Sequence, residues 1–199
     1  MKKKIRLPNK IVIASFNKGK LLEIKQLFKN TRVNFIAVST FTNIVPEENG
    51  KTFTENALIK ARSANKLSGH ASIADDSGLC INALNGEPGI FSSRWAGKNN
   101  NFSEAINMIE KKLENEENKT AYFICALALV LNTNQEFTFI GKVHGSLVFP
   151  PKGKRGFGYD PIFIPNKQIL TFGQMNPEKK DRISHRFKAY KKIEEAFFV

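Results

Sequence analysis

The segment KIVIASFNKGKLLEIKQLFKNTRVNFIAV, Lys10 to Val38, decides the fold class of this 199-residue chain. It opens with a β-branched apolar run over 10–15, which predicts a buried strand. A turn at 17–20 leads into an amphipathic helix to about residue 30, and a second strand follows over 33–38. Strand, helix and strand in this order favour parallel pairing, which predicts an α/β fold. The helix is expected to bury five apolar side chains: Leu21, Leu22, Ile24, Leu27 and Phe28.

Further helices and strands follow along the chain. Thr52-Phe53-Thr54-Glu55 has capping-box spacing, so a helix should begin there and run to about Leu67, before a strand over 71–75. A helix is expected at 103–114, followed by strands at 120–131 and 136–149 that a hairpin at 132–134 joins. A glycine-rich loop at 153–165 should run into a short strand, and a further helix should start at 176–178. A last helix should end the chain with one apolar stripe: Ile183, Phe187, Tyr190, Ile193 and Phe197. Neither a repeat nor a linker interrupts this order, so we expect one domain over 1–199 with a mixed sheet.

The overall composition narrows the class of protein. The net charge is +13, but the lysines are scattered, and general lysine- and asparagine-rich usage explains most of the excess. The apolar run after the basic N-terminus is too short for a signal peptide, and no run approaches the length of a membrane span. Cys80 and Cys125 both lie in apolar contexts, which predicts reduced core residues in a cytoplasmic protein.

The acidic pair in Asp75-Asp76-Ser77-Gly78 is the first candidate site. Two adjacent carboxylates at the end of a buried strand are costly unless positive charge faces them. One interpretation is a divalent metal site with one Asp as ligand or base. The other is an Asx-type turn in which both side chains cap backbone N–H groups. The pair alone does not separate the two.

Candidate phosphate contacts lie in the first two helical segments. The turn Ser15-Phe16-Asn17-Lys18-Gly19-Lys20 opens a helix, where phosphates bind readily. It departs from a P-loop, since Ala14 stands at the first glycine position and Leu21 follows the lysine. On the second helix Lys60 shares a face with Asn56, so it either lines a phosphate cleft or is simply solvated.

Candidate base contacts lie near the C-terminus. Glycines on both sides of Phe157 would let the backbone approach a flat ligand while the ring stacks on it; the alternative is a glycine-rich turn with a core phenylalanine. Ser184-His185-Arg186, shortly after Lys180, offers donors suited to a carbonyl oxygen and a phosphate.

Six motifs in register carry a resemblance to one family: SFNKGK, ENG-TFTENALIKA, ADDSGL, GEPGIFSSRWAG, GFGYDP and PEKKDRISHR. From about Ile11 to the C-terminus, the chain resembles the inosine triphosphate pyrophosphatases. These enzymes hydrolyse dITP, ITP and XTP to a monophosphate and pyrophosphate. The resemblance implies a two-lobed α/β domain with an active-site cleft between the lobes, Mg²⁺ as cofactor, a nucleoside triphosphate as partner and a homodimer, with neither nucleic acid nor membrane as partner.

The resemblance also implies roles for residues. Asp76 would be the proton acceptor for water and, with Glu48, a magnesium ligand. Phosphates would be held by Lys60 and Lys180, and Ser77 would contact the substrate. The triphosphate would be contacted by Ser15, Phe16, Asn17, Lys18, Gly19 and Lys20. The base would be stacked, oriented and read by Phe157, Gly158, Tyr159, Asp160, His185 and Arg186.

Three positions depart from the family pattern. Asn49 replaces a usual Thr, Trp95 stands where Tyr is common, and Asp181 stands where Asn is common. Asp181 matters most, because a carboxylate beside Lys180 would weaken its hold on phosphate. The alternative functions are a Maf-type pyrophosphatase for modified pyrimidine nucleotides and a basic nucleic-acid-binding module.

Overall fold

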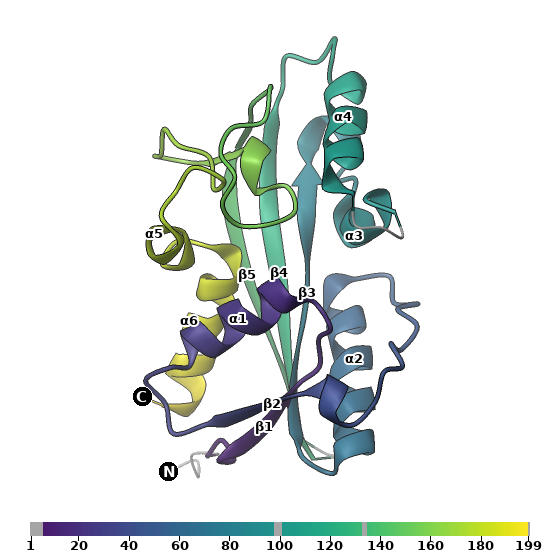
Figure 1. Cartoon of the computed structure of the whole chain (residues 1–199), viewed down its shortest axis with the longest axis vertical. Coiled ribbons are helices and arrows are strands. Elements are labelled where there is room, and N and C mark those ends of the chain that lie inside the picture. The colour runs from purple at the N-terminus through teal and green to yellow at the C-terminus, as the bar shows by residue number, and fades with distance from the viewer. Residues whose placement is uncertain (1–5, 98–100, 133–134, 199) are drawn as a thin grey trace. The chain divides into compact units, whose positions relative to one another are not determined.

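The computed structural model describes residues 6–97, 101–132 and 135–198. Within them it has an α/β fold with a six-stranded sheet in the order β2-β1-β3-β4-β5-β6 (Figure 1). The strands are β1 (Lys10–Ile13), β2 (Asn34–Ala37), β3 (Ala71–Ile81), β4 (Thr120–Asn132), β5 (Gln135–Leu147) and β6 (Phe163–Pro165). Because β1 pairs in parallel with β2 and β3 while β5 and β6 are antiparallel, the expected mixed sheet is confirmed.

Helices accompany these strands. They are α1 (Lys18–Leu27), α2 (Phe53–Ser68), α3 (Ser92–Trp95), α4 (Phe102–Lys112), α5 (Pro177–Asp181) and α6 (His185–Phe197). None of the described helices is both long and apolar enough to cross a membrane. Cys80 and Cys125 are free and buried, as expected.

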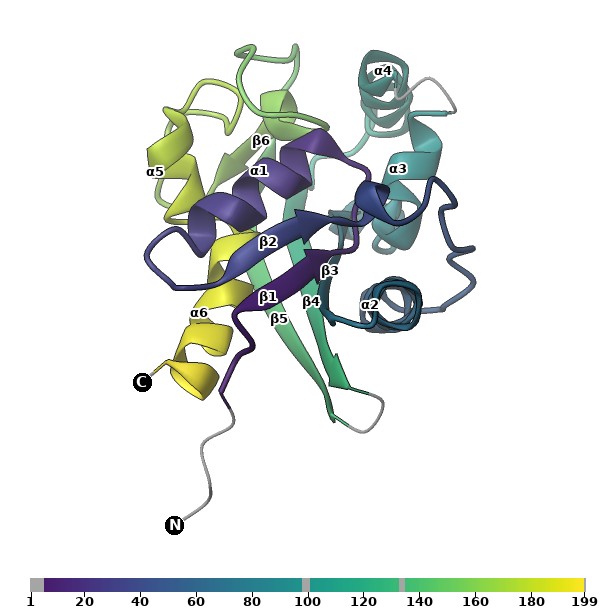
Figure 2. The ribbon, with the colours of Figure 1, turned by 60° about the horizontal axis from the view of Figure 1, so that its bottom comes forward.

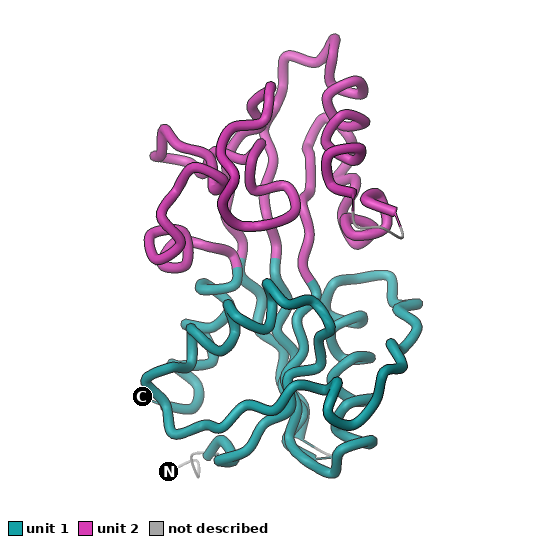
Figure 3. Tube along the Cα trace, in the orientation of Figure 1, with its two compact units in different colours: residues 1–76, 125–141, 186–199 teal, residues 77–124, 142–185 magenta. Residues whose placement is uncertain are grey.

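The chain divides into two compact units, which Figure 3 colours separately. Unit 1 comprises Met1–Asp76, Cys125–Gly141 and Arg186–Val199, and unit 2 comprises Ser77–Ile124 and Lys142–His185. Strands β3, β4 and β5 contribute residues to both units. Each unit has its own apolar core, so each is described by itself.

Unit 1 has apolar cores on both faces of its strands. Ile11 and Ile13 of β1 face the helices α1 and α6, whereas Val12 faces α2, as strand alternation requires. Figure 2 shows α2 on the side of β1 away from α6. The α2 face is built largely from small side chains: Ala57, Ala61, Ala64, Ala74, Ala126 and Ala128. This helix can therefore approach the sheet closely.

Unit 2 has an aromatic core, in which the Phe123 ring packs against Phe163 at a centroid distance of 4.7 Å. Ile106 and Ile109 of helix α4, together with Leu113 at its C-cap, are buried in this core.

The local signals at the helix starts are confirmed. Thr52 and Glu55 form the capping box of α2. Asn17 caps α1, and Asn176 caps α5 with Pro177 in the first turn. Caps are read well from sequence because they depend only on residues two or three positions apart.

Other expectations fail. Leu22 is 69% exposed, because it lies two residues from the buried Ile24 and so on the opposite side of α1. Ile183 lies outside the last helix: α5 ends at Asp181, and the Ile183 amide donates to the Lys180 carbonyl in a tight turn before α6.

The hairpin turn expected at 132–134 stays a prediction, because residues 133–134 lie outside the described residues. The strands β4 and β5 that it would join are neighbours in the sheet.

Candidate active site

The acidic pair lies inside a strand. Because β3 continues to Ile81, Asp75 and Asp76 stand in the middle of an eleven-residue strand rather than in a turn after one. The Asx-turn interpretation is therefore wrong, as is the strand end expected at Asp75. The length was underestimated because Ser77 and Gly78 look like turn residues, whereas both are held in the sheet. Both carboxylates are buried.

Asp75 belongs to a group in unit 1 made of four charged residues and one cysteine, here called the Asp75 cluster: Lys20, Glu23, Asp75, Cys125 and Arg186. The Asp75 carboxylate accepts from Arg186 Nε at 2.7 Å and from Cys125 Sγ at 3.0 Å, and Lys20 Nζ lies 2.7 Å from its other oxygen. The Arg186 guanidinium is buried and also donates to Glu23. Burial alone would raise the pKa of Asp75, but the charges of Arg186 and Lys20 hold it well below its usual range.

Asp76 belongs to a second group in unit 1, here called the Asp76 cluster: Glu48, Lys60 and Asp76. Lys60 Nζ lies 2.7 Å from Asp76 Oδ1 and 2.7 Å from Glu48 Oε1. Burial raises the pKa of Asp76, although the charges of Lys60 and Lys20 oppose that rise. Burial alone would lower the pKa of Lys60, but the Asp76 and Glu48 charges raise it. Of the residues that the structure describes, none donates a hydrogen bond to the buried Asp76 Oδ2.

The Asp76 cluster offers donors for a divalent cation. The described part of the chain holds no group of three or more His, Cys, Asp or Glu side chains arranged around a metal position. Magnesium does not need one, because it is commonly held by one or two carboxylates together with substrate phosphates. Two carboxylates meet at Lys60, and one buried oxygen of Asp76 is left over. Glu48 and Asp76 therefore offer the kind of oxygen donors that Mg²⁺ binds.

The turn at Ser15–Lys20 contributes its last residue to the Asp75 cluster. The Asn17 side chain accepts the Lys20 amide at 3.1 Å, which caps α1, and Ser15 is buried. Lys20 then reaches Asp75. Phe16 is 37% exposed, and Lys18 is exposed as well. The turn thus places a lysine beside the acidic pair.

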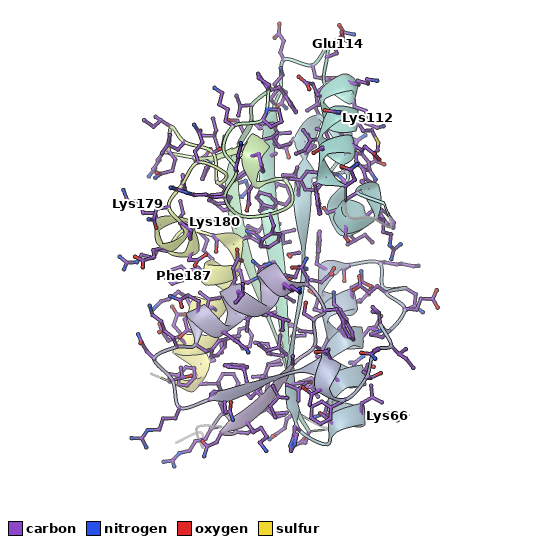
Figure 4. All side chains as sticks on the ribbon, viewed as in Figure 1. Lys66, Lys112, Glu114, Lys179, Lys180 and Phe187 are labelled. Carbon is purple, nitrogen blue, oxygen red and sulfur yellow. The ribbon has the colours of Figure 1, made fainter. Side chains whose placement is uncertain are left out.

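In unit 2, the segment GFGYD is organised around an ion pair. Lys180 Nζ lies 2.6 Å from Asp160 Oδ2, and both side chains are buried. The Asp160 carboxylate also accepts the Phe157 amide at 2.8 Å, and Lys180 Nζ lies 4.9 Å from the Phe157 ring centroid. Gly156 has φ +75°, and a Cβ there would clash with the Asp160 carboxylate. We call Phe157, Asp160 and Lys180 the Phe157 cluster; Figure 4 labels Lys180 on α5.

Two other predicted base contacts lie in the core of unit 2. The Tyr159 hydroxyl donates to the Ser92 carbonyl at 2.9 Å, the ring meets Phe102 edge-on, and burial raises the pKa of Tyr159. The His185 ring stacks on Phe123 with 5.0 Å between centroids. Although His185 and Arg186 are adjacent in sequence, the His185 ring contacts Phe123 in unit 2 and the Arg186 guanidinium contacts Asp75 in unit 1.

Side-chain contacts therefore divide the predicted residues into three groups. Lys20 and Arg186 meet at Asp75, Lys60 joins Glu48 to Asp76, and Lys180 joins Asp160 to Phe157. Ser77 follows Asp76 on β3 and is half-buried, and Gly158, at φ +65°, packs against Phe102. The roles of all these residues remain predictions.

Sequence reasoning missed two members of the Asp75 cluster. Glu23 lies three residues after Lys20 on α1, and that spacing places both on one helix face, so a signal existed. Cys125 carried no signal, because its contact with Asp75 joins positions fifty residues apart.

Comparisons with known proteins agree with one another. A sequence model described as the Ham1 family matches residues 11–196. A dITP/XTP pyrophosphatase from Caulobacter vibrioides is 45% identical over 191 residues, covering 95% of this chain and 98% of the relative. The solved structure of a HAM1 protein from Coxiella burnetii has a TM-score of 0.87 at 41% identity, over 94% of this chain and 98% of the other. A Staphylococcus aureus Ham1 structure has a TM-score of 0.84 at 39% identity, over 94% and 96%.

Proposed function

Because the chain belongs to the Ham1 family, we propose that it hydrolyses dITP, ITP, XTP and dXTP to the monophosphate and pyrophosphate. Such an enzyme keeps deaminated purines out of DNA and RNA. Relatives at 38–45% identity carry the name dITP/XTP pyrophosphatase. The observation that carries the proposal is the Asp76 cluster, in which Glu48 and Asp76 both contact Lys60 Nζ and the second, buried oxygen of Asp76 has no donor among the described residues.

We assign the triphosphate to unit 1. Lys20 and Lys60 supply positive charge there, and residues 15–20 open α1, whose N-terminus favours anions. A bound phosphate chain would compete with Asp75 for Lys20 and with Glu48 and Asp76 for Lys60. Mg²⁺, held by Glu48 and Asp76, would neutralise phosphate charge when bound.

In the proposed reaction, water attacks the α-phosphorus and the bond to the β-phosphate oxygen breaks. The water proton goes to Asp76, and pyrophosphate leaves with the bonding electron pair. A raised pKa suits Asp76 to this role, since a general base works best when its pKa approaches the working pH. Lys60, held against Asp76, is placed to stabilise the growing negative charge.

We assign the base to Phe157 and Asp160 of the Phe157 cluster, whereas Lys180 would hold a phosphate, as the resemblance implies. The Phe157 ring would stack on the purine, and the Asp160–Lys180 pair fixes the backbone on either side of that ring. Hypoxanthine and xanthine carry a 6-oxo acceptor that a donor of His185 or Arg186 would meet. Adenine presents an amino group there and would leave that donor unpaired, at a cost of about 1–3 kcal/mol.

We also propose that the protein is a homodimer, as the family resemblance implies, and that it is cytoplasmic, because both of its cysteines are free and buried. Light scattering on the purified protein tests the oligomeric state. The nucleoside triphosphate is the proposed partner; neither a nucleic acid nor a membrane is.

A substrate panel tests the proposed function. Pyrophosphate release is measured with ITP, dITP, XTP, GTP, ATP and modified pyrimidine triphosphates, with Mg²⁺ and with a chelator. We expect release from ITP, dITP and XTP in the presence of Mg²⁺ and little from ATP or GTP. Equal turnover of ATP would refute the specificity, and a preference for the pyrimidines would favour a Maf-type enzyme. Salt-sensitive binding of nucleic acid without hydrolysis would refute the proposal.

A further inference from the structure

Asn56 has a fully buried side-chain carboxamide, of which only the oxygen has a hydrogen-bond partner among the described residues. It lies in α2 with no exposed surface, and its Oδ1 accepts the Gly50 amide at 2.9 Å. An amide N–H can be met only by the carbonyl oxygen, so this bond fixes which way the side chain points. Across the described ranges 6–97, 101–132 and 135–198, Asn56 Nδ2 has no acceptor.

The contacts of Asn56 place it beside the Asp76 cluster. It precedes Lys60 by one helical turn, so the two side chains share a face of α2. Its partner Gly50 lies two residues after Glu48, which also contacts Lys60. The Gly50 amide is close enough that a Cβ there would lie 2.7 Å from Asn56 Oδ1. The unmatched donor therefore belongs to the region that holds Glu48 and Lys60.

A buried donor without an acceptor is destabilising, so such a group calls for an explanation. Alanine, which α2 carries at other buried positions, would leave no unmatched donor there. The mechanism so far uses Lys60 and Glu48 but gives Asn56 no part. Amide donors beside a lysine are suited to phosphate oxygens, which accept several hydrogen bonds at once.

We propose that Asn56 is a substrate-binding residue whose Nδ2 donates a hydrogen bond to an oxygen of the phosphate chain. The proposal rests on the proposed function, because it takes a nucleoside triphosphate as the ligand. The contact from Gly50 holds the carboxamide in the orientation that this bond requires. A purely structural Asn56 would only tie the Glu48 segment to α2.

The test measures binding of inorganic tripolyphosphate by titration calorimetry at alkaline pH, with Mg²⁺ and with a chelator. Asn56→Ala removes both ends of the carboxamide. Asn56→Asp keeps an acceptor for the Gly50 amide but replaces the donor with a negative charge. We expect both variants to weaken binding about 10- to 100-fold, the usual value of a hydrogen bond to a charged group.

Asn65→Ala is the matched control on the same helix. Its Nδ2 donates to the His70 carbonyl at 2.8 Å, so the substitution should lower the melting temperature without changing tripolyphosphate affinity. Wild-type affinity in Asn56→Asp would overturn the proposal, and this variant decides the question if Asn56→Ala does not fold. The proposed function fails on a different result, namely no pyrophosphate release from ITP, dITP or XTP by the wild type.

Discussion

Asp75 and Asp76 are neighbours on one strand, yet their clusters solve the problem of buried charge in opposite ways. In the Asp75 cluster, two cations converge on one carboxylate, and its pKa falls. In the Asp76 cluster, two carboxylates share the Lys60 ammonium, one oxygen has no donor among the described residues, and the pKa of Asp76 rises. Asp75 is thus satisfied by the protein itself, whereas Asp76 is left with capacity for a ligand. When titrating neighbours are driven apart in pKa, they are suited to different tasks.

The largest expected effect comes from Asp76→Asn. We expect kcat for ITP to fall about 10²- to 10⁴-fold, the usual contribution of a general base. The metal-free fold should not suffer, because burial raises the pKa of Asp76 and so opposes its ionised form. Near pH 7 the variant should therefore melt no lower than the wild type. Steady-state kinetics checks the expected loss of turnover, and thermal unfolding checks the expected stability. Near wild-type turnover would remove Asp76 from the mechanism.

Asp75→Asn should instead act on stability. It removes the charge that Arg186 and Lys20 face, and breaking a buried ion pair typically costs about 3–5 kcal/mol. The pKa of Asp75 is lowered in the folded state, so its stabilisation is present above the ordinary value of 3.8 and is lost as the pH falls through the folded-state value. Urea unfolding from pH 7 downward should show the difference between variant and wild type shrinking in acid. If the variant and the wild type differ little in unfolding free energy at pH 7, Asp75 and Asp76 do not differ in their contribution to stability as we infer.

Asp160→Asn extends the comparison to unit 2. The Phe157 cluster contains the buried ion pair of Asp160 and Lys180, and the substitution leaves the Lys180 ammonium without the Asp160 charge. We expect a loss of about 3 kcal/mol in the free energy of unfolding. The KM for ITP should rise more than kcat falls, because Asp160 is assigned to the base and not to the chemistry. A kcat loss as large as that of Asp76→Asn would contradict this assignment.

Arg62→Ala should have the smallest effect and serves as a surface reference. Arg62 donates to both oxygens of Glu136, but its side chain is 55% exposed. Exposed ion pairs contribute less than about 1 kcal/mol, and salt screens them. Unfolding measurements at low and high salt should show a small difference that narrows with salt. A loss comparable to that of Asp75→Asn would show that burial is not what separates the clusters.

Local features of the fold could be read from the sequence. The parallel βαβ unit and the caps at Asn17, Thr52 and Asn176 depend on residues close together in the chain. Leu22 was assigned to the wrong side of α1 because it lies two residues before the buried Ile24, which places it on the opposite side of the helix. The length of β3 was missed because pairing with neighbouring strands overrides the turn preference of Ser77 and Gly78.

The candidate site was predictable as a set of residues but not as a set of contacts. Motif order indicated Glu48, Lys60 and Asp76 together, and the structure joins them at Lys60. It could not indicate that Arg186 meets Asp75, since 111 positions separate them. Such long-range pairs follow from the packing of the whole unit, which no local pattern encodes.

The alanine-lined face of α2 has a consequence for how finely the site is set. Methyl groups at Ala57 and Ala61 meet the sheet, and the Ser72 hydroxyl bonds the Ala61 carbonyl at 2.6 Å. A methyl group has no alternative rotamer, so this contact cannot absorb an added carbon by rearranging. These alanines therefore set the distance between α2 and the sheet. That distance in turn sets how closely Lys60 approaches Asp76. Substitution of these alanines by larger residues should therefore displace Lys60 and lower activity before it unfolds the protein.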